Sequence, residues 1–138
     1  MLNKVLFIDD DSVALMLNRK LVEKALFAKE TVTALNGKLA MDYYLTLLEQ
    51  PQQENCCPQI VFLDLNMPVM DGWDFMEEFS RSIFPHFNQT KMVVLSSSIN
   101  PADLERTRKY PMVIEFIAKP VTIEILQRLE KDLNKTQI

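Results

Sequence analysis

The sequence predicts an α/β fold in which a five-stranded parallel sheet is doubly wound, with helices covering both of its faces. Short apolar runs rich in β-branched residues alternate with longer stretches in which apolar residues recur every three or four positions, which is typical of repeated strand–helix units. Three of these runs are apolar almost throughout, as in strands that are buried on both faces. We therefore expect five strands, five helices and a core on each side of the sheet.

The predicted strands are Lys4–Ile8, Glu30–Leu35, Gln59–Leu63, Lys91–Leu95 and Val113–Ile117. The first, third and fourth contain the nearly continuous apolar stretches, which places them inside the sheet. The second alternates apolar and polar residues more strongly, so we expect it at an edge.

The predicted helices are Ser12–Phe27, Lys38–Gln50, Trp73–Ser82, Ala102–Tyr110 and Ile123–Asn134. Polar residues suited to helix capping precede three of them, namely Asp11 with Ser12, Asn100 before Pro101, and Thr122. Pro111 should end the fourth helix because proline cannot continue one. The polar segment Pro51–Pro58 is expected to be an exposed loop.

Composition and charge exclude several classes of protein. The chain of 138 residues suits one domain, residues 1–138, without an effector domain. Its net charge of −4 and its lack of a basic run argue against direct nucleic-acid binding. The first apolar run, which ends at Asp9, is too short for a signal peptide or a membrane span, so we expect a cytoplasmic protein without a membrane partner.

Polar residues gather where four of the predicted strands end. In chain order they are Asp9-Asp10-Asp11, Asp64, Ser96-Ser97-Ser98 and Lys119-Pro120. An open parallel sheet binds its ligands at the carboxyl ends of its strands, so we expect these groups to form one site. Each group taken alone has a plainer interpretation as a turn, a helix cap or a solvated side chain. Together they favour a site, because independent turns would rarely supply such complementary groups.

The chemistry of this set indicates a metal and a phosphoryl group. Carboxylates that converge repel one another unless a cation lies among them, and Mg²⁺ prefers one or two carboxylates together with water and phosphate oxygens. Asp9, Asp10 and Asp64 therefore fit Mg²⁺. The Lys119 ammonium and the Ser96 hydroxyl suit phosphate oxygens, and a carboxylate can attack phosphorus to give an aspartyl phosphate.

Four segments resemble the receiver domains of two-component response regulators, particularly the single-domain, chemotaxis-regulator-like ones. These are Phe7–Ser12, Phe62–Gly72 with its Asp-Leu-Asn-Met-Pro and Met-Asp-Gly, Val94–Ser98, and Phe116–Pro120. The second segment is the most specific, and the four follow the order of the family over almost the whole chain. The resemblance implies a flavodoxin-like sheet with strand order 2-1-3-4-5.

The resemblance also implies roles for the site residues. It makes Asp64 the phosphoacceptor, Asp9 and Asp10 the acidic pair that binds Mg²⁺, and the backbone carbonyl of Asn66 a further metal ligand. Ser96 takes the position of the family's hydroxyl residue, and Lys119 that of its lysine, which precedes a proline that is commonly cis. Phe116 takes the aromatic switch position, and we expect it to turn inward when phosphorylation draws the Ser96 hydroxyl toward the site.

The implied partners are a sensor histidine kinase or a histidine phosphotransfer protein, which donates the phosphoryl group, and a downstream protein of unknown identity. The latter is expected to read the surface of the fourth helix, fifth strand and fifth helix. Such a chain is a signalling phosphoacceptor that catalyses only its own phosphorylation and dephosphorylation. Ser97 departs from the smaller residue that often follows the hydroxyl position, which slightly narrows access to Asp64.

Two alternatives remain open at this point. Asp9-Asp10-Asp11-Ser12-Val13 fits the loose motif of haloacid-dehalogenase-like phosphatases, in which the first aspartate is the nucleophile. A flavodoxin-like flavin-binding module could use the same fold, although three aspartates after the first strand would repel a flavin phosphate.

Other residues receive plainer interpretations. We expect Cys56 and Cys57 to be unreactive thiols, His86 to be a surface side chain, and Trp73 to pack at the start of its helix.

Overall fold

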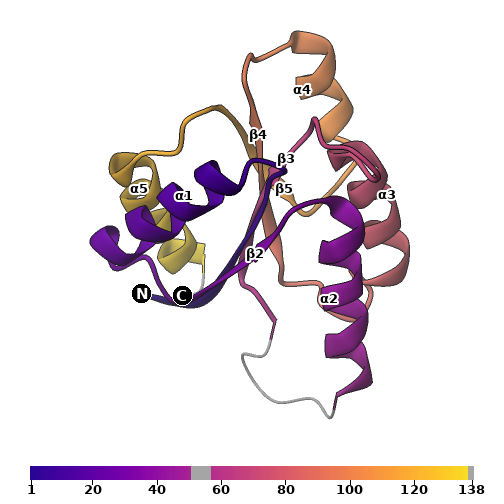
Figure 1. The fold of residues 1–138 in the computed structure, drawn as a ribbon, viewed down its shortest axis with the longest axis horizontal. Helices are drawn as coiled ribbons and strands as arrows, with labels where there is room; N and C mark the ends of the chain where they lie inside the picture. The colour runs from indigo at the N-terminus through magenta and orange to yellow at the C-terminus, as the bar shows by residue number, and fades with distance from the viewer. Residues whose placement is uncertain (51–56, 137–138) are drawn as a thin grey trace.

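The computed structural model describes residues 1–50 and 57–136, in which strands and helices alternate as expected (Figure 1). The strands are β1 (Leu2–Ile8), β2 (Ala28–Ala34), β3 (Ile60–Asp64), β4 (Lys91–Ser96) and β5 (Val113–Ala118). The helices are α1 (Ser12–Ala25), α2 (Gly37–Glu49), α3 (Gly72–Ser82), α4 (Pro101–Thr107) and α5 (Ile123–Thr136). Most of the predicted loop Pro51–Pro58 lies outside the described residues.

The strands form one parallel sheet in the order β2-β1-β3-β4-β5, which confirms the expected topology. The second strand lies at an edge, as its alternating pattern predicted. Between β1 and β3, Ile8 pairs with Leu63. The next residues, Asp9 directly after β1 and Asp64 at the end of β3, therefore lie side by side. Ser96 at the end of β4 pairs with Ala118 at the end of β5. The register therefore brings four strand ends to one edge of the sheet.

Helices cover both faces of the sheet. Figure 1 shows α1 and α5 on one side, and α2 and α3 on the other, with α4 extending beyond the upper end of α3. The first face buries a cluster that includes Phe7, Leu15, Val22, Phe62, Leu126 and Leu129. The second buries a cluster that includes Tyr44, Val61, Leu63, Phe75, Phe79 and Phe116. The inner strands contribute side chains to both clusters, which is why their sequences are apolar almost throughout.

Three of the helices begin where the capping residues predicted. The Asp11 carboxylate accepts hydrogen bonds from the backbone N–H groups of Val13 (2.9 Å) and Ala14 (3.3 Å). The Asn100 side chain accepts from Ala102, with Pro101 in the first turn, and Thr122 Oγ1 accepts from Ile125 (3.2 Å). The other two helices begin at caps that were not predicted, Asn36 for α2 and Asp71 for α3, whose side chains accept from Leu39 N and Asp74 N.

Two helices end earlier than predicted. Helix α4 ends at Thr107 instead of Tyr110, because the following residues Arg108, Lys109 and Tyr110 donate their N–H groups three residues back and form turns. Helix α1 ends at Ala25, because Leu26 adopts a left-handed conformation (φ 51°) and redirects the chain into β2. The periodic apolar pattern continues past both ends, so it could not locate them.

In the part of the chain that the structure describes, every helix falls short of the length and apolar character that crossing a membrane would require.

Candidate functional site

The four polar strand ends meet at one edge of the sheet. Asp9 directly follows β1, and Asp64 is the last residue of β3. Ser96 ends β4, and Lys119 comes directly after β5, where its N–H donates to the Ser96 carbonyl at 2.8 Å. Because adjacent strands are parallel and in register, residues far apart in the sequence become neighbours here. The structure thus brings together the groups that the sequence placed at strand ends.

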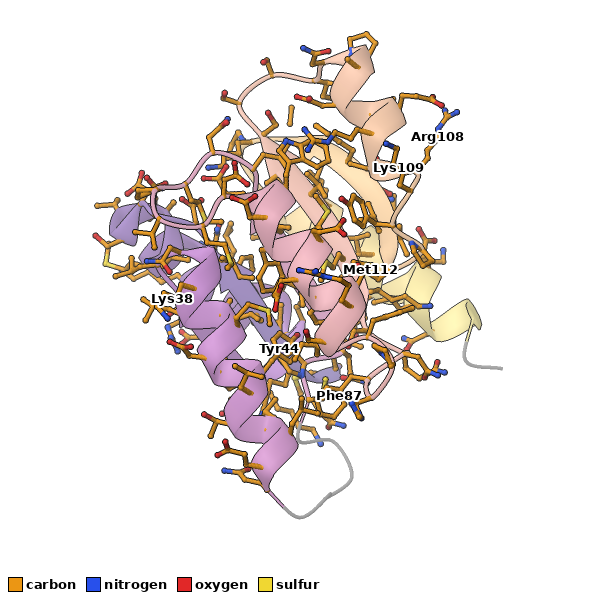
Figure 2. All side chains as sticks on the ribbon, turned by 90° about the vertical axis from the view of Figure 1, so that its right-hand side faces the viewer. Lys38, Tyr44, Phe87, Arg108, Lys109 and Met112 are labelled. Carbon is orange, nitrogen blue, oxygen red and sulfur yellow. The ribbon has the colours of Figure 1, made fainter. Side chains whose placement is uncertain are left out.

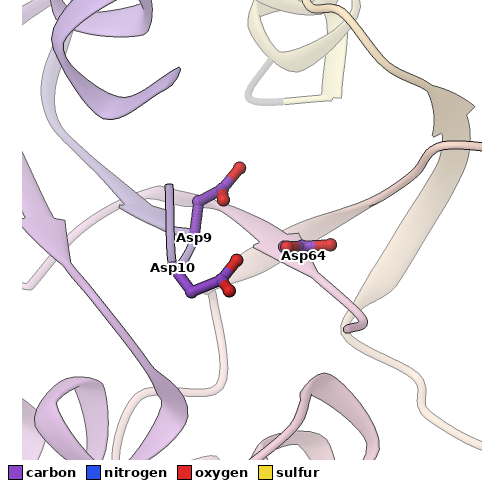
Figure 3. A group of neighbouring side chains, drawn as sticks. All are labelled: Asp9, Asp10 and Asp64. Atoms are coloured by element: carbon purple, nitrogen blue, oxygen red, sulfur yellow. The ribbon is translucent and has the colours of Figure 1, made fainter. Parts of the chain in front are cut away.

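Three carboxylates form the acidic centre of this edge. Figure 3 shows Asp9 and Asp10 beside the end of β1, with the Asp64 carboxylate close by on β3. One oxygen from each carboxylate lies within 4.8 Å of the others. Asp9 and Asp64 are buried, whereas Asp10 is exposed. Backbone N–H groups hold the buried pair: Asp11 N donates to Asp9 Oδ1 (2.9 Å) and Asn66 N to Asp64 Oδ1 (3.3 Å).

Lys119 supplies the positive charge of the site. Its Nζ donates to Asp9 Oδ2 at 3.0 Å and lies 3.3 Å from Asp64 Oδ2, so one ammonium bridges the two buried carboxylates. The peptide bond between Lys119 and Pro120 is cis, as the resemblance led us to expect. From the end of β5, the Lys119 ammonium contacts both carboxylates and partly offsets their repulsion.

Burial and charge act in opposite directions on Asp64. Desolvation raises the pKa of its carboxyl above the ordinary aspartate value, and the nearby Asp9 charge adds to this effect. The charge of Lys119 and the N–H of Asn66 lower the pKa, but they do not fully cancel the rise. Partial burial lowers the pKa of Lys119, yet its hydrogen bond to Asp9 and the charge of Asp64 raise that pKa overall. The Asp64 anion is thus incompletely compensated by protein groups alone.

The donor set fits a hard divalent cation. Mg²⁺ binds oxygen ligands at about 2.1 Å, so opposite ligands of one ion lie about 4.2 Å apart. The carboxylate oxygens of Asp9, Asp10 and Asp64, within 4.8 Å of one another, could reach this geometry by small rotations of the side chains. Asn66 is exposed and lies two residues beyond Asp64, near the start of the β3–α3 loop. A cation here would lower the pKa of Asp64, which burial raises most and the Asp9 charge raises further.

Ser96 and Phe116 lie on the neighbouring strands, and both are buried. The Ser96 hydroxyl oxygen accepts a hydrogen bond from Ser98 N at 3.4 Å. Phe116 is only 8% exposed and belongs to the cluster beneath α3, together with Val94 and Met112. The aromatic side chain of Phe116 therefore points inward, into this cluster.

A contact between α3 and α4 was not foreseen from the sequence. Trp73 packs at the start of α3, as predicted, but the guanidinium carbon of Arg106 also lies 4.2 Å from the centre of its ring. The Tyr110 hydroxyl, just after α4, donates to the Glu77 carboxylate at 3.1 Å. These partners are more than 30 residues apart in the sequence, and no periodicity links them. Only the packing of the two helices reveals the pairs.

His86 lies at the surface, as predicted, whereas the low reactivity of Cys56 and Cys57 stays a prediction. His86 is exposed in a turn after α3. Cys57 is half-buried, with its sulfur 3.5 Å from Thr90 Oγ1, and Cys56 lies outside the described residues. Asp11, the third residue of the phosphatase-like motif, directs its carboxylate at the N-terminus of α1. That orientation weakens the phosphatase interpretation, which would use Asp11 in the site.

Comparison with known proteins identifies the class that this fold and site define. The response regulator receiver domain family matches residues 5–130, so the chain belongs to this family. Receiver domains are signalling phosphoacceptors and not metabolic enzymes, and they generally bind Mg²⁺ at an acidic pocket. The phosphatase and flavin-binding alternatives are thereby set aside.

Individual relatives agree with this assignment. The chain is 28% identical over 131 residues to the probable methanogenesis regulatory protein FilR2 of Methanothrix harundinacea, covering 95% of this chain and 81% of that protein. It also resembles the crystal structure of a two-component response regulator from Cytophaga hutchinsonii, with a TM-score of 0.85, 26% identity and coverage of 97% and 98%. The chemotaxis protein CheY4 of Vibrio cholerae shares the fold, with a TM-score of 0.74, 20% identity and coverage of 96% and 98%.

Proposed function

We propose that Asp64 accepts a phosphoryl group from a phosphohistidine, with Mg²⁺ held by Asp9, Asp10, Asp64 and the backbone carbonyl of Asn66. One observation carries this proposal. The Asp64 carboxylate ends the central strand, within reach of two further carboxylates and of the Lys119 ammonium. The raised pKa of Asp64 adds support, because an anion that protein groups compensate incompletely gains from a cation beside it.

In the proposed reaction an Asp64 oxygen attacks phosphorus, a phosphorus–oxygen bond forms, and the phosphorus–nitrogen bond to the donor histidine breaks. The electron pair of the broken bond leaves with the imidazole nitrogen. Bound Mg²⁺ would neutralise charge on the transferred phosphoryl oxygens. Lys119 would move its ammonium from Asp64 toward a phosphoryl oxygen, and the Ser96 hydroxyl would donate a hydrogen bond to another. Water that later attacks the acyl phosphate would regenerate the carboxylate.

The proposed signal passes from Ser96 to the surface of α4, β5 and α5. A phosphoryl group adds charge and strong acceptor oxygens, which would draw the Ser96 hydroxyl toward Asp64 and away from Ser98. Phe116 lies inward in the structure, and phosphorylation would favour this position over an outward one. A downstream protein that binds only the stabilised surface would then read the signal. The phosphoryl donor would be a sensor histidine kinase or a histidine phosphotransfer protein.

The test is phosphorylation by acetyl phosphate and Mg²⁺, followed by borohydride trapping and peptide mapping. We expect one phosphoryl group, on Asp64, and none on an Asp64→Asn variant. Asp11→Asn is the matched control, because asparagine also caps helices and Asp11 points away from the site; it should be labelled like the wild type. Labelling of the Asp64→Asn variant at the wild-type level, or mapping to Asp9, would refute the proposal.

A further inference from the structure

The loop that connects β3 to α3, residues 65–71, is held in place by both glycines of the chain. The sequence contains only two glycines, Gly37 and Gly72. The Gly72 N–H donates to the Leu65 carbonyl at 3.0 Å, and a Cβ on Gly72 would lie 2.7 Å from the Asp64 carbonyl oxygen. Gly72 therefore lets the end of the loop fold back onto its beginning.

Gly37 holds the other part of this loop from a different element. It is the first residue of α2, it is buried, and its N–H donates to the Met70 carbonyl at 3.1 Å. A Cβ on Gly37 would lie 2.8 Å from both the carbonyl oxygen and Cγ of Met70, closer than real Cβ contacts come. Neither distance leaves room for a side chain at position 37. The Met70 carbonyl belongs to the backbone, so it cannot turn aside as a side chain could. The loop thus rests directly on the α2 backbone.

The loop conformation that results is strained. Val69 has a φ of 70°, in the left-handed region that a β-branched residue rarely adopts, and the next residue, Met70, donates its N–H to the Pro68 carbonyl at 2.8 Å. Such strain persists only where the surroundings enforce it. The hydrogen bond from Gly37 N–H holds Met70, the residue directly after the strained Val69. This bond comes from α2, outside the loop.

The end of β2, just before α2, contacts the other half of the acidic site. The Asp9 N–H donates to the carbonyl of Ala34, the last residue of β2, at 3.0 Å, and Gly37 follows three residues later. The Asn36 side chain fixes the turn between them by accepting from Leu39 N at 2.9 Å. A short stretch of backbone, residues 34–37, therefore joins Asp9 to the loop that carries Asn66.

From these contacts we infer that Gly37 is a positioning residue for the metal site, because it sets the β3–α3 loop, and with it the Asn66 carbonyl, relative to Asp9. This inference rests on the proposed function, since it concerns the same Mg²⁺ site. Gly37 itself contributes no metal ligand; it acts through Met70. Any side chain at position 37 would push the loop away from α2 and move Asn66.

The test measures Mg²⁺ affinity by isothermal titration calorimetry, at a temperature where circular dichroism shows each variant to be folded. Gly37→Ala should weaken Mg²⁺ binding about tenfold or more, as changes to residues behind metal ligands commonly do. Phosphorylation by acetyl phosphate should slow at limiting Mg²⁺ and recover at saturating Mg²⁺, since Asp64 itself is untouched. Ala40→Gly is the matched control: it destabilises the same helix at a buried position but keeps the Gly37 N–H bond to the Met70 carbonyl, and should bind Mg²⁺ like the wild type.

A second variant keeps the test decisive if Gly37→Ala does not fold. Met70→Gly removes the side chain that packs against Gly37 and frees the loop, so it too should weaken Mg²⁺ binding. The inference is overturned if folded Gly37→Ala and Met70→Gly bind Mg²⁺ with wild-type affinity. It is also overturned if Ala40→Gly loses as much Mg²⁺ affinity as Gly37→Ala. If the wild-type protein itself binds no Mg²⁺, the proposed function fails and the inference fails with it. Wild-type binding together with unchanged variants overturns the inference alone.

Discussion

At the scale of single residues, the cost of burying Asp64 is the feature that most directly links structure to chemistry. The carboxylate is nearly inaccessible, and Lys119 approaches both Asp64 and Asp9 with a single positive charge. The net effect is a raised pKa for Asp64. A carboxylate that is easy to bury would gain little from a metal ion, whereas the proposed Mg²⁺ would stabilise the Asp64 anion.

Asp64→Asn should therefore stabilise the Mg²⁺-free protein at neutral pH. Because the folded-state pKa of Asp64 is raised, its protonated form favours folding at low pH, and that contribution is lost as the pH rises through the raised pKa. Asparagine does not ionise, so the variant does not lose this stability as the pH rises. Urea unfolding without Mg²⁺ should give a higher midpoint for the variant at pH 7, and the difference should narrow as the pH falls. A less stable variant at pH 7 would mean that the ion pair with Lys119 outweighs the cost of burial.

Val69→Asn should also stabilise the protein. Val69 is 78% exposed with a φ of 70°, so its side chain gives little packing while its backbone is strained. Asparagine tolerates the left-handed region better than a β-branched residue, and the gain should be about 1 kcal/mol in the free energy of unfolding. Urea unfolding provides the measurement. Val13→Asn, at an exposed helical position, is the control and should give no such gain.

At the scale of elements, helix α4 is tied to α3 by side chains on its inner side. Arg106 stacks on Trp73, and Tyr110 reaches Glu77. Helix α4 has only seven residues and contributes one buried residue, Thr107, so these pairs form a large part of what positions it. Because α4 belongs to the surface that we propose as the output of the switch, the strength of this attachment affects how easily the surface can change.

A double-mutant cycle should detect the stacking. With Trp73→Leu and Arg106→Met, we expect a coupling energy of about 0.5–1 kcal/mol, the usual range for an exposed cation–π pair. Urea unfolding of the four proteins gives the coupling. The control cycle replaces Arg108, which pairs with Glu105 at 3.0 Å and not with the ring; its coupling to Trp73 should be near zero. A coupling energy of zero between Arg106 and Trp73 would mean that the stacking does not stabilise the protein.

The elements also show how far the sequence alone could go. Alternating apolar runs and periodic segments predicted all ten elements, because burial on a sheet or helix face leaves a local pattern. The ends of α1 and α4 were misplaced, because the left-handed backbone of Leu26 and the three-residue turns at Arg108–Tyr110 are not marked by residue type. The strand-end residues of the site were predictable for a different reason: a parallel sheet brings strand ends together regardless of their distance in sequence.

What the sequence could not supply were contacts between elements. The Arg106–Trp73 stacking and the approach of Met70 to Gly37 depend on how helices and loops pack, which periodicity does not encode. The one sequence signal for Gly37 was the scarcity of glycine in this chain. The inward position of Phe116 likewise required the packed structure, since the motif identified the residue but not its conformation.

At the scale of the whole molecule, Mg²⁺ should stabilise the fold, because the acidic site exists only when β1 and β3 are paired. Binding to the native state alone should add about 2.7 kcal/mol when the free ion exceeds its dissociation constant a hundredfold. Thermal unfolding in rising Mg²⁺ is the measurement. Asp10→Ala should lose most of this rise, since Asp10 is exposed and we propose it as a metal ligand. An equal rise in wild type and variant would exclude Asp10 from the site.

The central claim is that one edge of the sheet binds Mg²⁺ and a phosphoryl group together, with Asp64 as the acceptor. A crystal structure with Mg²⁺ and beryllofluoride, which mimics an acyl phosphate, tests every part of it at once. We predict beryllofluoride on Asp64, Mg²⁺ bound by Asp9, Asp10, Asp64 and the Asn66 carbonyl, and contacts from Ser96 and Lys119 to the fluorine atoms. Beryllofluoride on another residue, or Mg²⁺ bound away from these carboxylates, would contradict the account.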